Sequence, residues 1–182
     1  MTARLRQVLC LSGSLRGRSS NTAALLAAAT RAPATLAFAF YRGMEGLPAF
    51  NPDVEMTVLP APVQALRDAV NTADALLIAC PEYAHGVPGA FKNLLDWLVG
   101  SEHFPGKPVL QLNVSGRGAQ HAQAALSEVL RTMSARLLSE QPFRVGLPAR
   151  GCDVDEVLAN AACCAELDVA LDHLAASLLR VE

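Results

Sequence analysis

Short apolar segments alternate with longer amphipathic ones along this chain, and this alternation limits the possible folds more than any other feature. The short segments are bounded by Gly, Pro, Ser or Asn, which is typical of strands buried on both faces. They cover residues 7–11, 35–41, 75–80 and 108–114, and residues 137–145 form a weaker fifth candidate. The sequence therefore predicts a sheet of five strands.

Between these strands, apolar residues recur at steps of three and four, the period of a helix with one buried face. The pattern predicts helices over residues 60–73, 88–99, from about 118 onward, and over 153–179, where an acidic cluster begins the last one. Strands joined by crossover helices form a parallel sheet covered on both faces, so we expect an α/β fold. Residues 42–57 contain two Pro and two Gly and are predicted to form an extended surface loop.

The composition of the chain is that of one globular domain over residues 1–182. Hydrophobic residues make up 52% and charged residues 18%, which permits a large core and argues against disorder. A formal net charge of −2 at pH 7 offers no basic surface for nucleic acid. No apolar run reaches the roughly 18 residues that span a bilayer, and residues 8–11 are too short for a signal peptide, so we expect a cytoplasmic protein.

The five cysteines predict neither a disulfide framework nor a metal site. Their number is odd, and none forms a CxxC pair or a zinc-like spacing with histidine. Cys10 and Cys80 lie in apolar runs, and Cys163 and Cys164 lie in an Ala-rich helical stretch. We therefore interpret them as small core residues.

The loop after the first strand, SGSLRGRSSNT at residues 12–22, combines hydroxyl, glycine and arginine residues at the start of a helix. Free backbone N–H groups at a helix N-terminus favour an anion, and serine hydroxyls and arginines bind phosphate oxygens. The loop lacks both GxxxxGK[ST] and GxGxxG, which argues against an NTPase and a standard dinucleotide fold. It predicts a phosphate site, and the alternative is that Ser19 or Ser20 merely caps the helix.

Two further loops follow strands at the same edge of the sheet, where open parallel sheets bind ligands. Residues 81–89, PEYAHGVPG, place Tyr83 and His85 on a backbone path set by Pro and Gly, where their rings would contact a planar ligand. The alternatives are core packing for Tyr83 and an ordinary surface position for His85. Residues 113–121, NVSGRGAQH, expose backbone N–H groups, and their glycines permit close backbone approach.

Four segments of the chain resemble the flavodoxin-like NAD(P)H-dependent FMN reductases, a family that includes quinone, azo-dye and chromate reductases. They are GSLRGRSSN at 13–21, LPAFNPD at 47–53, PEYAHGVPGAFKNLLDW at 81–97 and SGRGAQHAQAALSEVL at 115–130. The resemblance covers roughly residues 5–145. It implies a flavodoxin-like three-layer sandwich with sheet order 2-1-3-4-5, and FMN where that order reverses.

The resemblance also implies which residues would bind FMN. The phosphate would lie against the first loop, at Ser12, Ser14, Leu15, Arg16, Ser19, Ser20 and Asn21. The isoalloxazine ring would be edged by Pro81, Glu82, Tyr83, Ala84, His85 and Gly86, with Ser115, Gly116 and Arg117 on its other side.

By the same resemblance, the chain would be an oxidoreductase that passes hydride from NADPH or NADH through FMN to a quinone, free flavin, azo compound or metal oxyanion. The flavin would carry the chemistry, so no acid–base pair or nucleophile is expected, and only His85 or Tyr83 would protonate a bound quinone. The alternatives are a flavodoxin-type electron carrier and a flavin-free scaffold protein. The low net charge disfavours the carrier, and the hydroxyl-rich first loop disfavours the scaffold.

Lys92, Asn93, Asp96 and Trp97 share a helix face, and the alternative to a functional role is that Lys92 and Asp96, spaced i,i+4, form only a surface ion pair. In the family, the region around them lies near subunit contacts. The resemblance therefore implies a homodimer or homotetramer, in which residues 42–57 of a second subunit would complete the substrate pocket.

Overall fold

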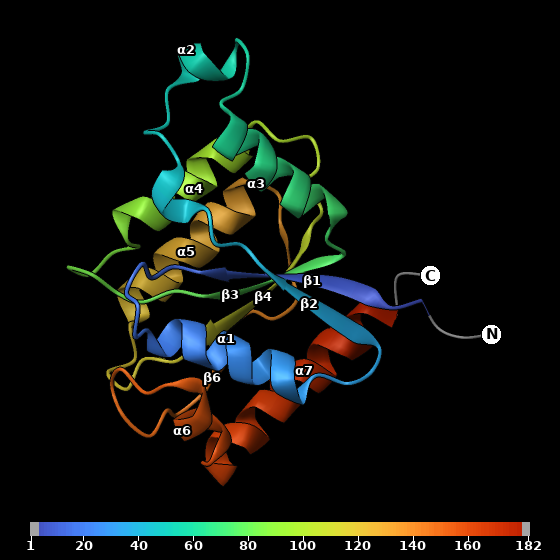
Figure 1. The fold of residues 1–182 in the computed structure, drawn as a ribbon, viewed down its shortest axis with the longest axis vertical. Helices are drawn as coiled ribbons and strands as arrows, with labels where there is room; N and C mark the ends of the chain where they lie inside the picture. The colour runs from blue at the N-terminus through green and yellow to red at the C-terminus, as the bar shows by residue number, and fades with distance from the viewer. Residues whose placement is uncertain (1–3, 180–182) are drawn as a thin grey trace.

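The computed structural model describes residues 4–179, which form a parallel sheet covered by helices on both faces (Figure 1). The sheet has six strands in this part of the chain: β1 (Arg6–Ser12), β2 (Leu36–Phe40), β3 (Ala75–Ala79), β4 (Pro108–Asn113), β5 (Arg136–Leu137) and β6 (Phe143–Arg144). The strand order is β2-β1-β3-β4-β5, and every pair is parallel. The predicted flavodoxin-like order is confirmed.

The fifth strand differs from its prediction over residues 137–145, because two short strands replace it. β5 pairs with β4 at Pro108 and Val109, whereas β6 pairs with the other end of β4 at Leu112 and Asn113. Between them the chain leaves the sheet over residues 138–142, which include a polar run followed by a proline. A proline has no N–H to donate to the ladder, which accounts for the interruption.

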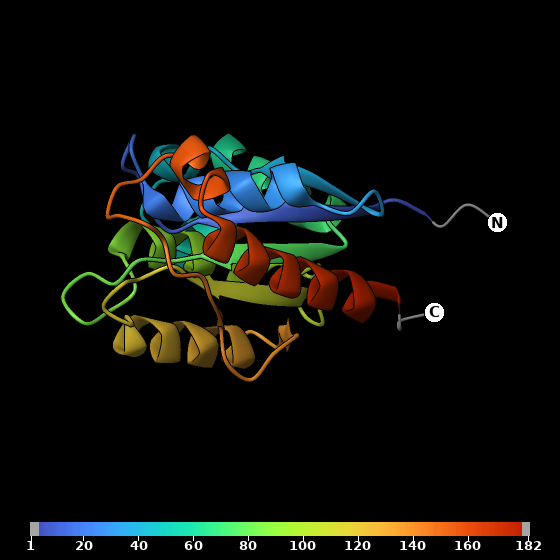
Figure 2. The ribbon, with the colours of Figure 1, turned by 90° about the horizontal axis from the view of Figure 1, so that it is seen from below.

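The helices lie in two layers, one on each side of the sheet (Figures 1 and 2). Helices α1, α6 and α7 cover one face, and α3, α4 and α5 cover the other. The bounds are α1 Ser20–Arg31, α2 Pro52–Glu55, α3 Ala61–Thr72, α4 Gly89–Val99, α5 Gln120–Thr132, α6 Val154–Leu158 and α7 Ala161–Leu179, with a 3-10 helix at Met44–Gly46. Among the described residues, no helix is long and apolar enough to cross a membrane.

The sheet separates two apolar clusters that form the core. Phe91 and Trp97 of α4 are fully buried in the cluster beneath α3–α5. The cluster beneath α1 and α7 is built from smaller side chains, including Ala24 and Ala27 of α1. Every residue of β3 is buried, as the continuous apolar run predicted. Each large apolar side chain buried in this way contributes about 1.5–3 kcal/mol.

The predicted helix over residues 153–179 is divided into α6 and α7. Asp153 and Glu156 form a capping box at the start of α6, so the acidic cluster does mark a helix N-terminus. The helix stops after Leu158, and Asn160 begins α7 by accepting the backbone N–H of Cys163 at 3.0 Å. An Asn side chain competes for backbone donors in this manner, which explains the break.

The segment over residues 42–57 lies mostly at the surface, as predicted, but it is not an extended loop, because it forms two short helices and is attached to α4. It contains the 3-10 helix and α2, and it buries Met44 and Leu47. Trp97 Nε1 donates to the carbonyl of Pro48 at 2.8 Å, and Asn93 accepts the N–H of Phe50 at 2.8 Å. These side-chain bonds from α4 replace the regular backbone ladder that the segment lacks.

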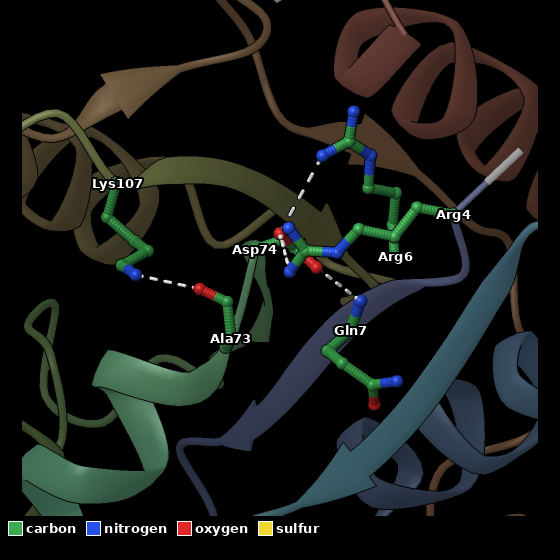
Figure 3. A network of polar contacts seen from close by, with 6 residues as sticks. All are labelled: Arg4, Arg6, Gln7, Ala73, Asp74 and Lys107. Atoms are coloured by element: carbon green, nitrogen blue, oxygen red, sulfur yellow. Dashed lines mark hydrogen bonds and ion pairs between the residues drawn. The ribbon is translucent and has the colours of Figure 1, made fainter.

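At the amino ends of the strands, Asp74 joins β1 to β3 (Figure 3). Its Oδ1 lies 3.2 Å from Arg4 Nη2 and 3.8 Å from Arg6 Nη1. Its Oδ2 accepts the backbone N–H of Gln7 at 2.8 Å. The carboxylate therefore satisfies a backbone donor and two guanidinium groups at once.

Lys107 lies beside this group, just before β4 (Figure 3). Its Nζ donates to the carbonyl of Ala73 at 2.7 Å. Burial lowers the pKa of Lys107, and the charge of Asp74 partly opposes that shift. The amino end of the sheet thus carries a compact set of mutually bonded polar groups.

Candidate functional site

A cleft of about 510 Å³ lies at the carboxyl ends of the central strands, where the three predicted loops meet. Its volume is typical of a small-molecule site. The lining residues are Ser14, Arg16, Arg18, Ser19, Ser20, Asn21, Pro81, Glu82, Tyr83, Val114, Ser115, Gly116, Arg117, Ala119, Leu147, Ala149, Arg150 and Gly151. Loops that are far apart in the sequence therefore form one site.

Gly13 allows the first two loops to approach closely. Its N–H donates to the carbonyl of Ala79 at 2.9 Å. A Cβ at this position would lie 2.8 Å from Cys80 Sγ and 3.1 Å from the Cδ of Pro81. Only glycine fits here without displacing the loop after β3.

The serines of the first loop are partly used to shape the loop itself. Ser19 caps α1 by accepting the N–H of Thr22 at 3.4 Å. Ser12 Oγ lies 2.9 Å from Thr22 Oγ1, and Ser20 Oγ accepts the N–H of Gly151 at 2.7 Å. The capping alternative therefore holds for Ser19, which also lines the cleft.

The cleft contains polar groups that have no protein partner. Asn21 is 8% exposed, and its buried Oδ1 makes no hydrogen bond within residues 4–179. Arg16, Arg117 and Arg150 are exposed, and no ion pair joins them to any described side chain. Arg18 differs, since its Nη2 lies 3.6 Å from Asp153 and 3.5 Å from Glu156. A partnerless buried acceptor beside three uncompensated cations indicates a site for an anionic, hydrogen-bonding ligand.

The second loop ends in a tight turn with both central residues in the left-handed region. Tyr83 and Gly86 exchange backbone hydrogen bonds of 3.1 and 2.9 Å, and φ is 48° at Ala84 and 60° at His85. Such conformations are unfavourable for residues other than glycine, and they concentrate at functional sites. Tyr83 is 49% exposed, which rules out the core-packing alternative.

Glu82 is held at the start of α5 rather than free in the cleft. Its Oε2 accepts the N–H of Ala122 at 2.9 Å, a favourable position for a carboxylate at a helix N-terminus. Its Oε1 lies 3.9 Å from His85 Nδ1. The His85 ring packs edge-on against His121, with ring centroids 4.5 Å apart. Glu82 thereby connects the second loop to the first turn of α5.

The third loop is shaped by Asn113, whose amide bridges it. Its Oδ1 accepts the N–H of Ser115 at 3.1 Å, and its Nδ2 donates to the carbonyl of Gly118 at 2.5 Å. Gly118 has φ +91°, which explains the glycine, and Ala119 has φ 49° directly before α5. The strained backbone leaves Ser115 and Gly116 on the cleft surface.

Eleven of the predicted site residues line the cleft: Ser14, Arg16, Ser19, Ser20, Asn21, Pro81, Glu82, Tyr83, Ser115, Gly116 and Arg117. Ser12, Leu15, Ala84, His85 and Gly86 do not line it, although they belong to the same loops. The prediction missed a fourth wall at residues 147–151, which follows β6. The sequence feature that could have indicated this wall is the Arg-Gly pair at residues 150 and 151, after the weak fifth strand.

The cysteines provide no nucleophile for this site. All five are unpaired and buried. Burial raises the pKa of Cys80 to about 12 and raises that of Cys10 strongly. Their interpretation as core residues is confirmed, because all five are buried among the apolar core residues.

Comparison with known proteins identifies the relatives of this chain. The sequence profile described as NADPH-dependent FMN reductase matches residues 6–146. An NAD(P)H-dependent FMN reductase of Pseudomonas aeruginosa is 38% identical over 128 residues, 68% of this chain and 69% of that protein. A quinone reductase of Escherichia coli is 33% identical over 146 residues, 78% of each chain.

Among solved structures, a flavoenzyme NAD(P)H:(acceptor) oxidoreductase from Paracoccus denitrificans is similar, with a TM-score of 0.72 and 27% identity. The match covers 93% of this chain and 97% of that one. Sequence and structure thus agree on the resemblance inferred from the four segments, and with it on an oxidoreductase that uses FMN and NAD(P)H. The chain belongs to the NADPH-dependent FMN reductase family.

Proposed function

We propose that this protein binds FMN in the cleft at the carboxyl ends of its strands and reduces quinones with NAD(P)H. The observation that carries the proposal is the convergence of three uncompensated arginines, a helix N-terminus and an exposed Tyr83 turn on one cleft of about 510 Å³. Bound FMN would supply the redox chemistry, accepting hydride from NAD(P)H and passing electrons to the acceptor.

The lining residues fit the phosphate and ribityl parts of FMN. Arg16 and the first N–H groups of α1 would bind the phosphate dianion. The partnerless Oδ1 of Asn21 would accept from a ribityl hydroxyl. A Cβ at Gly116 would meet no protein atom within 4 Å, so packing within the chain does not require glycine there. That space is available to a ligand that approaches the backbone.

The residues around the turn favour a flat acceptor. Tyr83 offers an exposed ring, and His85 is joined to Glu82 and His121 at the rim. Two-electron reduction of a quinone consumes a proton, which His85 or Tyr83 would donate. Relatives named quinone reductase in Escherichia coli and 2-hydroxy-1,4-benzoquinone reductase in a Burkholderia species favour the same acceptor class.

Steady-state kinetics with NADPH or NADH would test the acceptor class. A soluble benzoquinone, free FMN, an azo dye and chromate are compared as acceptors at matched concentrations. The proposal expects the quinone to have the largest kcat/KM. A higher value for any other acceptor would contradict the quinone assignment, and no turnover with any of them would favour the electron carrier.

We also propose that the protein forms a homodimer or homotetramer through the region around α2. Met56 and Val58 are 79% and 89% exposed, and Val99 at the end of α4 is 59% exposed. A Cβ on Gly100 would lie 2.8 Å from Glu55 Cδ, so the two exposed regions adjoin. Figure 1 shows α2 projecting beyond the α3–α4 layer. Apolar side chains gathered on a projection are typical of an interface.

Light scattering at micromolar concentration would measure the mass. The proposal expects at least twice the 19.2 kDa of one chain, and a lower mass for Met56→Lys. A monomeric wild-type protein would contradict it.

A further inference from the structure

The fourth wall of the cleft, residues 147–151, lies just beyond the residues that the family profile matches. The family profile ends at residue 146, whereas the wall contributes Leu147, Ala149, Arg150 and Gly151 to the cleft lining. It connects β6 to α6. The profile therefore assigns no role to this wall.

The wall is attached to the N-terminus of α1. The N–H of Gly151 donates to Ser20 Oγ at 2.7 Å, and Ser20 is the first residue of α1. Next to the wall, Asp153 and Glu156 lie within ion-pair distance of Arg18. Cys152, between the two connections, is 2% exposed and belongs to the core. These contacts hold the wall beside the helix end that attracts an anion.

Arg150 lies on this wall without a compensating charge. It is exposed, and no described carboxylate pairs with it, in contrast to Arg18. It lines the same cleft as Arg16 of the first loop and Asn21 of α1, whose buried Oδ1 is without a partner. An arginine left unpaired next to a helix N-terminus is arranged to bind a phosphate.

We propose that Arg150 is a second phosphate-binding arginine, so that the FMN phosphate is held between the first loop and the wall. This inference rests on the proposed function. It assigns the phosphate two arginines from two neighbouring segments, Arg16 of the first loop and Arg150 of the wall, in addition to the backbone donors of α1. Arg18 positions the wall through Asp153 and Glu156 instead of binding the phosphate.

The test compares FMN with riboflavin, which lacks only the phosphate. Dissociation constants of both are measured by flavin fluorescence on flavin-free wild-type protein and on Arg150→Gln. We expect Arg150→Gln to weaken FMN binding by about tenfold or more and to leave riboflavin binding within about twofold. Arg150→Lys keeps the charge without the planar fork and should recover part of the loss.

Arg136→Gln is the matched control, because Arg136 is an exposed arginine on β5 at the opposite end of β4. It should leave both constants unchanged. KM for NADPH and KM for NADH are measured on the same variants. This comparison tests whether Arg150 binds the additional phosphate of NADPH instead of the phosphate of FMN.

Three outcomes would overturn the inference. These are an unchanged FMN-to-riboflavin ratio in Arg150→Gln, an equal loss of both flavins, and a rise in KM confined to NADPH. Wild-type protein that binds neither flavin would instead refute the proposed function, so the two failures are distinguishable.

Discussion

The arginines at the two ends of the parallel sheet differ in whether they have carboxylate partners. At the amino end, Asp74 pairs with Arg4 and Arg6 and accepts a backbone N–H (Figure 3). At the carboxyl end, Arg16 and Arg150 have no carboxylate partner among the described residues. Charges that are paired within the protein stabilise it, whereas charges that are left unpaired are available to a ligand. The difference indicates which end is structural and which is functional.

The largest effect on stability is expected at the amino end. Asp74→Ala removes the carboxylate that bonds to two arginines and to Gln7, and should lower the free energy of unfolding by about 1–3 kcal/mol. FMN affinity should stay the same. Urea unfolding and flavin titration measure the two quantities. Asp172→Ala, an exposed carboxylate on α7, is the control and should change stability by less than about 0.5 kcal/mol. A loss of FMN affinity in Asp74→Ala would show that the two ends are not independent.

At the carboxyl end, a substitution is expected to lower FMN affinity and to leave stability nearly unchanged. Arg16→Gln should weaken FMN binding by about tenfold, because a charge-assisted bond to the phosphate is lost. The stability of the flavin-free protein should change by no more than about 0.5 kcal/mol. Flavin titration and urea unfolding are again compared. Unfolding of the flavin-free variant at clearly lower urea would assign Arg16 a structural role and weaken the contrast.

A smaller effect tests whether the functional end carries backbone strain. Ala84 has φ 48° at the tip of the second loop. Asn tolerates this left-handed conformation better than Ala, so Ala84→Asn should raise the free energy of unfolding by about 0.5–1 kcal/mol. Thermal unfolding of the two proteins provides the measurement. Equal or lower stability of the variant would argue that the turn is unstrained.

The smallest effect concerns pH at the amino end. Burial lowers the pKa of Lys107 below its usual 10.5, so between the folded and unfolded pKa values the unfolded chain binds more protons. The contribution of Lys107 to stability therefore rises with pH toward 10.5 and is least favourable at lower pH. Over this pH interval, the free energy of unfolding of wild type should rise relative to that of Lys107→Met. A difference that is flat with pH would contradict the desolvation of Lys107.

The parts of the fold that the sequence predicted are those with strong local patterns. The central strands are buried on both faces and read as continuous apolar runs, and α3, α4 and α5 show clear helical periods. The interrupted fifth strand and the break at Asn160 depend on which backbone groups find tertiary or side-chain partners. Periodicity alone does not encode those choices.

The candidate site was likewise predicted where the local sequence pattern is strong and missed where it is weak. The three loops after strong strands were predicted, because glycines and hydroxyls marked them and topology brought them to one edge. The wall at residues 147–151 follows a two-residue strand within a segment that gave only a weak strand signal, and the loop after it was not recognised as part of the site. The exclusion of His85 from the cleft lining was not predicted either, and His85 lies in a turn with positive φ at Ala84 and His85, a conformation that is rare for residues other than glycine.

The most direct test of the central claim is a visible spectrum of the purified protein with added FMN, followed by anaerobic addition of NADPH and then NADH. The account predicts that FMN binds with a perturbed flavin spectrum and that its absorbance bleaches rapidly on addition of the reduced coenzyme. Failure to bind FMN would contradict the assignment of the cleft. Bound flavin that stays oxidised would contradict the reductase activity and leave an electron carrier.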